Sequence, residues 1–285
     1  MNKAYALRVF AFAALFSLAQ GVAAGAPHPE MLVSTEWLAG HGNGPNLVLL
    51  HVGRDRKVYD EGHIPGARFV SWTELVITRD GVPNELPPIP DLVRAFERLG
   101  VAPDSRIVLY GEGPGPYAAR VFFTLDYLGL GERTALLDGG LEKWRAEQRP
   151  LSQTEPPQKP GRLEPRVRQD ALIEIDAVRR ALAAPDAVVI DVRAPADYAV
   201  AHLPGARNLP GRDLLAGAVL RSPEEMLELW RAAGLAPGKT AIVYCNTGMM
   251  AALSYFTLRY LGHPVRLYDG SLLEWNRVEK GVPSN

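Results

Sequence analysis

The chain has 285 residues, of which 47% are hydrophobic and 22% charged, with a formal net charge of -1 at pH 7. This length exceeds the usual size of one domain, and the composition excludes a disordered or fibrous protein. The balance of 31 basic against 32 acidic residues argues against a polybasic surface for nucleic acid or membranes. We therefore expect two globular domains and small-molecule partners, and the sequence indicates no particular protein partner.

The first 24 residues are typical of a secretory signal peptide. Lys3 and Arg8 precede an apolar run from Val9 to Ala19, and Val22-Ala23-Ala24 offers small residues for cleavage. The run is short for a membrane span, so an uncleaved N-terminal anchor is the weaker alternative. We expect export to the periplasm, cleavage after Ala24, and no membrane attachment afterwards.

Each half of the remaining chain alternates short runs of Val, Ile and Leu with helical patterns. This alternation predicts an α/β fold of two domains, each a parallel sheet flanked by helices on both faces. We place the domains at residues 29–151 and 166–285, joined by a proline-rich, semi-extended linker at 152–165. The expected strands are Asn46–Val52, Arg106–Tyr110, Ala187–Val192 and Thr240–Tyr244. An expected helix begins at the Ser222-Pro223-Glu224-Glu225 capping pattern and closes at Gly234.

The two halves repeat the same sequence blocks in the same order, which indicates a duplicated domain. The paired blocks are Leu49–Gly53 with Val189–Arg193, His63–Arg68 with His202–Arg207, Gly100–Tyr110 with Gly234–Tyr244, Ala118–Gly129 with Ala251–Gly262, and Asp138–Trp144 with Asp269–Trp275.

The first half lacks a nucleophile where the second half has one. Its loop, Gly111–Tyr117, contains no cysteine, and His51 and Gly53 stand where the second half has an aspartate and an arginine. We expect this site to have decayed. Tyr117 is predicted either to wall the catalytic pocket or to pack between the domains. We expect structural roles for His63, His202, Trp72, Trp144, Trp230 and Trp275.

The single cysteine of the chain, Cys245, lies between a buried strand and an apolar helix from Ala251 to Leu261. The cysteine therefore lies at the carboxyl end of a strand, which is where open α/β sheets bind ligands. The N-terminus of the following helix favours an anion at this place. Such a position lowers the pKa of a thiol below its free value of about 8.5. Gly248 allows the loop to curl so that amides converge. We therefore predict Cys245 as nucleophile, with a binding loop made of Asn246, Thr247, Gly248, Met249 and Met250.

Four segments of the second half together resemble the rhodanese superfamily: Asp191-Val-Arg193, His202–Ala206, Cys245–Met250 and Asp269–Trp275. The tandem layout, with a cysteine only in the second half, is similar to thiosulfate and 3-mercaptopyruvate sulfurtransferases. The resemblance implies transfer of sulfane sulfur from a donor such as thiosulfate to a thiol or cyanide acceptor through a Cys245 persulfide. It also implies that Arg193 contacts the donor, or that Asp191 and Arg193 brace the loop as an ion pair.

Several alternatives follow from the same residues. Protein phosphatases also place a cysteine before a helix, but they need an arginine in the loop to grip phosphate, and this loop has none. The uncharged loop matches neither basic thiosulfate-specific loops nor small-residue mercaptopyruvate-specific loops, so both donors stay open. A non-catalytic binding or persulfide-sensing module is a third possibility. Metal-ligand clusters, phosphate loops and dinucleotide fingerprints are absent from the sequence, so we expect no metal and no cofactor.

Overall fold

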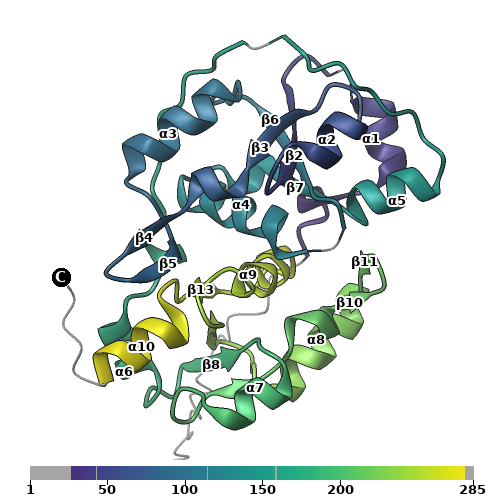
Figure 1. The fold of residues 1–285 in the computed structure, drawn as a ribbon. Helices are drawn as coiled ribbons and strands as arrows, with labels where there is room; N and C mark the ends of the chain where they lie inside the picture. The colour runs from purple at the N-terminus through teal and green to yellow at the C-terminus, as the bar shows by residue number, and fades with distance from the viewer. Residues whose placement is uncertain (1–26, 43, 114, 158, 280–285) are drawn as a thin grey trace, which may run out of the picture.

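The computed structural model describes residues 27–42, 44–113, 115–157 and 159–279, and in it the chain forms two parallel β-sheets (Figure 1). The first sheet has the strand order β1-β7-β6-β2-β3 and the second β13-β12-β8-β9, with parallel pairing between all neighbours. Helices cover the faces of both sheets, so the expected α/β fold class is confirmed. The predicted signal peptide lies outside the described residues. Within the described ranges, every helix is too short or too polar to span a membrane.

The predicted strands are the central strands of the two sheets. The first sheet consists of β1 (Leu32–Val33), β2 (Leu47–Gly53), β3 (Arg68–Ser71), β6 (Arg106–Tyr110) and β7 (Thr134–Leu137). The second consists of β8 (Ala187–Asp191), β9 (Arg207–Asn208), β12 (Thr240–Tyr244) and β13 (Val265–Leu267). The bounds of β6 and β12 agree with the sequence prediction, and those of β2 and β8 differ by one residue at one or both ends. The strands at and near the sheet edges are too short to give a clear hydrophobic pattern.

Ten α-helices are distributed evenly between the halves of the described chain. The first five are α1 (Thr35–His41), α2 (Lys57–Glu61), α3 (Ile89–Arg98), α4 (Pro116–Tyr127) and α5 (Gly140–Ala146). The second five are α6 (Ile175–Ala181), α7 (Pro195–Val200), α8 (Pro223–Ala232), α9 (Ala251–Tyr260) and α10 (Ser271–Glu279). The capping box expected at α8 is present, because Ser222 accepts from the Glu225 amide while the Glu225 carboxylate accepts from the Ser222 amide.

One hydrophobic cluster runs through both domains and holds them together. It contains the inward faces of both sheets together with buried residues of α4 and α9. These two helices pack against each other between the sheets (Figure 1). Phe122 meets Phe256 edge to face with ring centroids 4.8 Å apart, and Phe123 meets Tyr255 at 5.0 Å. Edge-to-face aromatic pairs add to the burial energy, so the contact between domains is an apolar core rather than a hinge.

Two β-hairpins that the sequence did not predict reach across from each domain to the other. In the first domain β4 (Ile77–Arg79) pairs with β5 (Val82–Glu85), and in the second β10 (Leu215–Ala216) pairs with β11 (Val219–Leu220). The amide of Leu86 donates to Asp269 in the second domain (3.1 Å), and the amide of Leu220 donates to Asp138 in the first (3.1 Å). Asp138 and Asp269 are equivalent in the repeat, so each domain contacts the other through a hairpin at an equivalent position.

The predicted linker lies along the first domain. Gly161 donates to the Glu97 carbonyl and Arg166 to the Leu128 carbonyl, while the Leu163 side chain is buried. A Cβ at Gly161 would lie 1.9 Å from the Val101 carbonyl oxygen, so only glycine fits this close approach. Backbone contacts therefore hold this extended segment along its length.

The hairpin of the first domain carries a glutamate whose charge is disfavoured. Burial, and then the nearby Asp269 carboxylate, raise the pKa of Glu85 to about 7, although its ion pair with Arg79 (3.4 Å) opposes the shift. A raised pKa in the folded state means that the folded protein binds the proton more tightly than the unfolded chain does. The contribution of Glu85 to stability is therefore greatest below the pKa of a glutamate in the unfolded chain. It is lost as pH rises through the folded-state pKa of about 7.

A Glu85→Gln variant is expected to lose this fall and to exceed the wild type in stability at pH 8 by on the order of 1 kcal/mol. Urea unfolding from pH 5 to pH 8 measures the effect. Glu132→Gln, at an exposed position, is the matched control and should keep the wild-type slope. Equal slopes for wild type and Glu85→Gln would contradict the assignment.

Candidate active site

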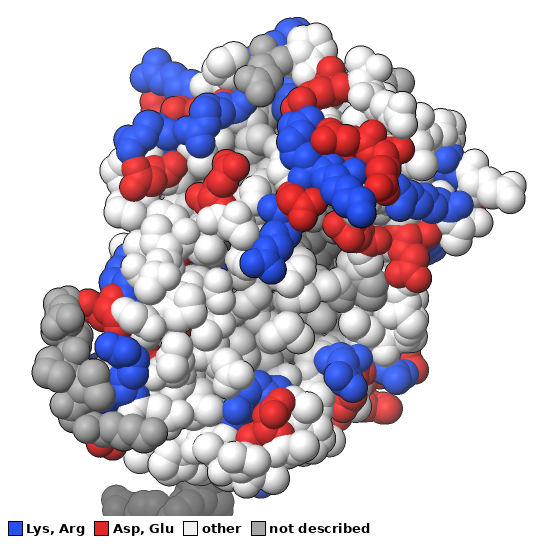
Figure 2. Space-filling model, in the orientation of Figure 1, with Lys and Arg blue, Asp and Glu red and all other residues white. Residues whose placement is uncertain are grey.

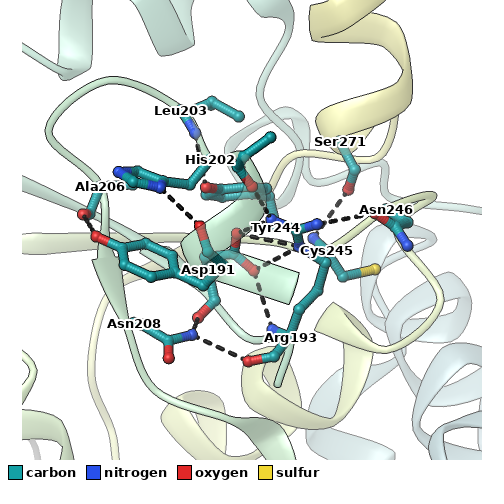
Figure 3. Close-up of polar contacts among 12 residues, drawn as sticks. Asp191, Arg193, His202, Leu203, Ala206, Asn208, Tyr244, Cys245, Asn246 and Ser271 are labelled. Atoms are coloured by element: carbon teal, nitrogen blue, oxygen red, sulfur yellow. Dashed lines mark hydrogen bonds and ion pairs between the residues drawn. The ribbon is translucent and has the colours of Figure 1, made fainter. Parts of the chain in front are cut away.

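Cys245 directly follows β12 and is separated from α9 by the loop of residues 246–250. Its side chain is 1% exposed and belongs to the core cluster shared by the domains. In Figure 3 its sulfur points away from the Asp191 carboxylate. Burying a thiolate is costly unless nearby dipoles stabilise it. The hydrogen-bonding groups of the loop therefore decide the chemistry of this cysteine.

The start of α10 holds the loop in place. The amides of Leu272 and Leu273 donate to the carbonyls of Cys245 and Asn246, both at 3.1 Å. The Ser271 hydroxyl accepts from the Cys245 amide (3.2 Å) and the Gly248 amide (3.0 Å), and it donates to the Tyr268 carbonyl (2.8 Å). The Gly248 amide, which was expected in the cradle, is thus occupied by a side chain, as is the amide of Cys245 itself. Within the described ranges, those of Asn246, Thr247, Met249 and Met250 donate to no protein acceptor.

Ser271 is a site residue that the sequence reasoning missed. It adopts a left-handed conformation with φ of +53°, which is unusual for a residue with a side chain. Its repeat partner is Gly140, also at +53°. The signal was therefore a serine standing at a position whose partner is a glycine. The strained backbone suggests that the hydroxyl is needed there.

Asp191 and Arg193, which the sequence places at the end of β8, form an ion pair beneath the loop. The guanidinium contacts both carboxylate oxygens, with Nη2 to Oδ2 at 2.6 Å and Nε to Oδ1 at 3.0 Å. It also donates to the Asn246 side chain at 3.3 Å (Figure 3) and to the Ala201 carbonyl. Burial would lower the pKa of Arg193, but hydrogen bonding and attraction to Asp191 outweigh it and raise that pKa. Every nitrogen of the guanidinium is engaged, so this geometry favours bracing of the loop over contact with a donor.

The first domain also contacts the cysteine loop from across the interface. The Asn84 side chain, at the end of its hairpin, donates to the Thr247 hydroxyl (2.9 Å). Arg120 on α4 pairs with both oxygens of Asp269, at 2.5 and 3.0 Å. Neither Asn84 nor Arg120 carried a signal in the sequence, because their partners lie more than a hundred residues away in the chain.

Comparison with known proteins matches the rhodanese-like domain to residues 34–147 and 174–278. The chain belongs to the rhodanese family. It is 34% identical to the sulfur carrier protein TtuD of Thermus thermophilus, across 91% of this chain and 98% of that protein. It is 31% identical to a probable 3-mercaptopyruvate sulfurtransferase of Pseudomonas aeruginosa (86% and 94%) and 29% identical to a thiosulfate sulfurtransferase of Corynebacterium glutamicum (88% and 89%).

Among solved structures, the rhodanese-fold protein SseA of Escherichia coli, described with the 3-mercaptopyruvate sulfotransferases, has a TM-score of 0.77 and 28% identity. The match covers 85% of this chain and 98% of SseA. The tandem rhodanese architecture suggested by the repeat is therefore confirmed.

The two rhodanese domains build their loops in the same way but only one contains a nucleophile. Leu141 and Glu142 donate to the carbonyls of Gly111 and Glu112 (2.9 and 3.0 Å), as α10 does for the cysteine loop. Gly111 therefore stands at the position of Cys245. His51, the partner of Asp191, is fully buried, and burial lowers its pKa to about 4. A neutral imidazole cannot replace an ion pair as a brace.

Tyr117 belongs to the first domain's own loop. Its ring stacks on Trp72 of the same domain with centroids 4.8 Å apart, and it lines a cavity of about 500 Å³ beside Gly111 and Arg54. The prediction that it walls the Cys245 pocket or packs between domains is therefore wrong. The reason is geometric, because Tyr117 lies in the first turn of α4, directly after the loop of its own domain. The two turn histidines, His63 and His202, bond helix carbonyls at 2.8 Å, as structural residues do.

Proposed function

We propose that this rhodanese-family chain is a sulfurtransferase that moves sulfane sulfur from a donor such as thiosulfate to a thiophilic acceptor through a persulfide on Cys245. The observation that carries the proposal is the geometry of the loop. The one cysteine of the chain lies at the carboxyl end of β12, ahead of a helix N-terminus and beside loop amides that have no acceptor in the described part of the chain. Such groups stabilise a thiolate and a charged persulfide sulfur.

The reaction follows as two displacements at sulfur. The Cys245 thiolate attacks the sulfane sulfur of the donor, a sulfur–sulfur bond forms, and sulfite leaves thiosulfate with the electron pair of the broken bond. An acceptor thiolate or cyanide then attacks the outer sulfur of the persulfide. The Cys245 thiolate leaves with the second electron pair and the enzyme is regenerated.

Both thiosulfate and 3-mercaptopyruvate are candidate donors, since relatives at similar identity are named for each. The loop from Asn246 to Met250 is uncharged. Arg193, the nearby guanidinium, is committed to Asp191. A doubly charged donor would meet amides and the partial charge of the helix, which supports comparing both donors directly.

The decisive experiment measures sulfur on the protein itself. After incubation with either donor, intact-mass spectrometry is expected to show one added sulfur atom on Cys245, and cyanide should remove it as thiocyanate. Absence of both products with both donors would contradict the proposal. Specific retention of a partner protein by wild type and Cys245→Ala alike, without turnover, would instead favour a non-catalytic binding module.

An Arg193→Lys variant separates the two roles considered for that residue. Lysine keeps the charge but cannot reproduce the paired contacts to Asp191. If Arg193 braces the loop, kcat is expected to fall about ten-fold with little change in KM for thiosulfate. A rise in KM at constant kcat would show that the guanidinium binds the donor. Steady-state kinetics with cyanide as acceptor measures both constants.

We also propose that residues 1–24 direct export to the periplasm, and that the mature protein consists of domains 29–151 and 166–285 with the linker 152–165. The charged and apolar pattern of the first residues supports this. Cell fractionation followed by N-terminal sequencing tests it, and an uncleaved, membrane-bound product would contradict it. On the face in Figure 2, charges of both signs are interspersed, which supports small-molecule partners over nucleic acid.

A further inference from the structure

A buried arginine of the cysteine-free domain reaches the back of the cysteine loop. Arg120 is 1% exposed, and its guanidinium pairs with both oxygens of Asp269 and donates to the Asn84 carbonyl. Removing two charges from water is costly, and a buried pair is often no more stable than apolar residues of the same size. A contribution to stability alone therefore does not account for this buried ion pair.

Asp269 lies directly against the cysteine loop. A Cβ added to Gly248 would be 2.3 Å from the Asp269 side-chain oxygen Oδ1 and 2.7 Å from its carbonyl oxygen. The other carboxylate oxygen accepts from the Leu86 amide. Two residues further on, Ser271 binds the Cys245 and Gly248 amides. The position of Asp269 thus sets the position of the loop.

Arg120 also fixes a second point of the loop. It binds the carbonyl of Asn84, a residue with a left-handed backbone at φ of +68°. The side chain of Asn84 donates to the Thr247 hydroxyl. One guanidinium therefore connects both routes by which the first domain contacts the loop.

The repeat provides an internal comparison. Arg120 aligns with Leu253, as Ala118 and Ala119 align with Ala251 and Ala252. Leu253 lies beside the cysteine-free loop and Asp138, the partner of Asp269. Asp138 accepts from the Leu220 amide, and among the residues that the structure describes its one ion-pair partner is Lys143, at 4.0 Å. At the interface, Leu253 thus lies beside the loop without a cysteine, and Arg120 occupies the equivalent place behind the loop that contains Cys245.

We infer that Arg120 is a positioning residue for the Cys245 loop, supplied by the domain that has no nucleophile. It neutralises the Asp269 carboxylate behind the loop and holds Asp269 and Asn84 in place. Without it, a carboxylate would lie close to the loop that must carry a second negative charge, and like charges disfavour the ionised thiol. The inference rests on the proposed function for its purpose, but it makes a separate claim about the reactivity of the thiol.

The test is the pH profile of Cys245 alkylation by iodoacetamide in the full chain. Arg120→Leu, which introduces the residue of the other half, is expected to slow alkylation at neutral pH about ten-fold and to leave the rate at high pH near that of the wild type. A double variant, Arg120→Leu with Asp269→Asn, removes both charges and is expected to return the profile toward that of the wild type. If Arg120→Leu alone fails to fold, Arg120→Gln, which removes the charge but keeps a polar side chain, takes its place with the same expected slowing.

The matched control is the second ion cluster of the interface. Asp126 is bound there by Tyr255 (2.6 Å), Arg168 (2.7 Å) and Arg259 (3.0 Å), away from the cysteine loop. Arg259→Leu is expected to lower stability while leaving the alkylation profile unchanged. A wild-type profile in folded Arg120→Leu, or an equal shift in Arg259→Leu, would overturn the inference. Because alkylation requires no sulfur transfer, failure of persulfide loading in the wild type would reject the proposed function alone.

Discussion

Replacing Cys245 by serine is expected to lower sulfur transfer by more than about 10⁴-fold. A serine hydroxyl stays protonated at neutral pH and cannot form a persulfide, so the covalent intermediate is lost rather than weakened. Because the chain contains no other cysteine, no second thiol can take over the sulfur. The measurement is thiocyanate formation from thiosulfate and cyanide, paired with intact mass to follow the sulfur on the protein.

The control for this variant is its stability. Cys245 is buried in the apolar cluster, where a serine introduces a hydroxyl and is expected to cost about 1–3 kcal/mol. Circular dichroism and urea unfolding should therefore show a folded protein. Turnover in a folded Cys245→Ser variant would contradict the persulfide mechanism.

The second large effect is expected from Gly248→Ala. The glycine has φ of +74°, a conformation that costs a residue with a side chain about 1–2 kcal/mol. The added Cβ would also lie 2.3 Å from the Asp269 carboxylate, which Arg120 holds in place. Since the carboxylate cannot move freely, the loop must shift, and we expect activity to fall by about 100-fold or more.

Gly66→Ala separates the two causes. Gly66 has a similar φ of +82°, but a Cβ there would meet nothing within 4 Å. This control should lose about 1 kcal/mol of stability and keep its activity. Kinetics and urea unfolding of both variants measure the difference. Equal activity in Gly248→Ala and Gly66→Ala would show that catalysis does not depend on the close approach of Gly248 to Asp269.

The parts of the fold that the sequence predicted correctly are those with strong local patterns. Local patterns predict the long apolar strands β2, β6, β8 and β12 and the capped helix α8. The hydrophobic period of a strand or a helix depends only on residues that are neighbours in the chain. The crossing hairpins were missed because their strands are short and the aspartates that bind them, Asp269 and Asp138, lie in the other domain. The placement of Tyr117 failed for the same reason, since it depended on how the domains pack.

The sequence by itself determined that the chain is a duplicated α/β protein with one cysteine between a strand and a helix. A strand, a loop and a helix N-terminus are local features, so their order along the chain is sufficient to place a nucleophile. Only the tertiary structure decided what surrounds it. Ser271 occupies two of the loop amides, Arg193 is committed to Asp191, and Arg120 approaches from the other domain. Hydrogen bonds and ion pairs act over a few ångströms in space, and Ser271 and Arg120 are distant in sequence from the groups they bind. For Arg193, whose partner is only two residues away, the structure decided between the two roles that the sequence left open.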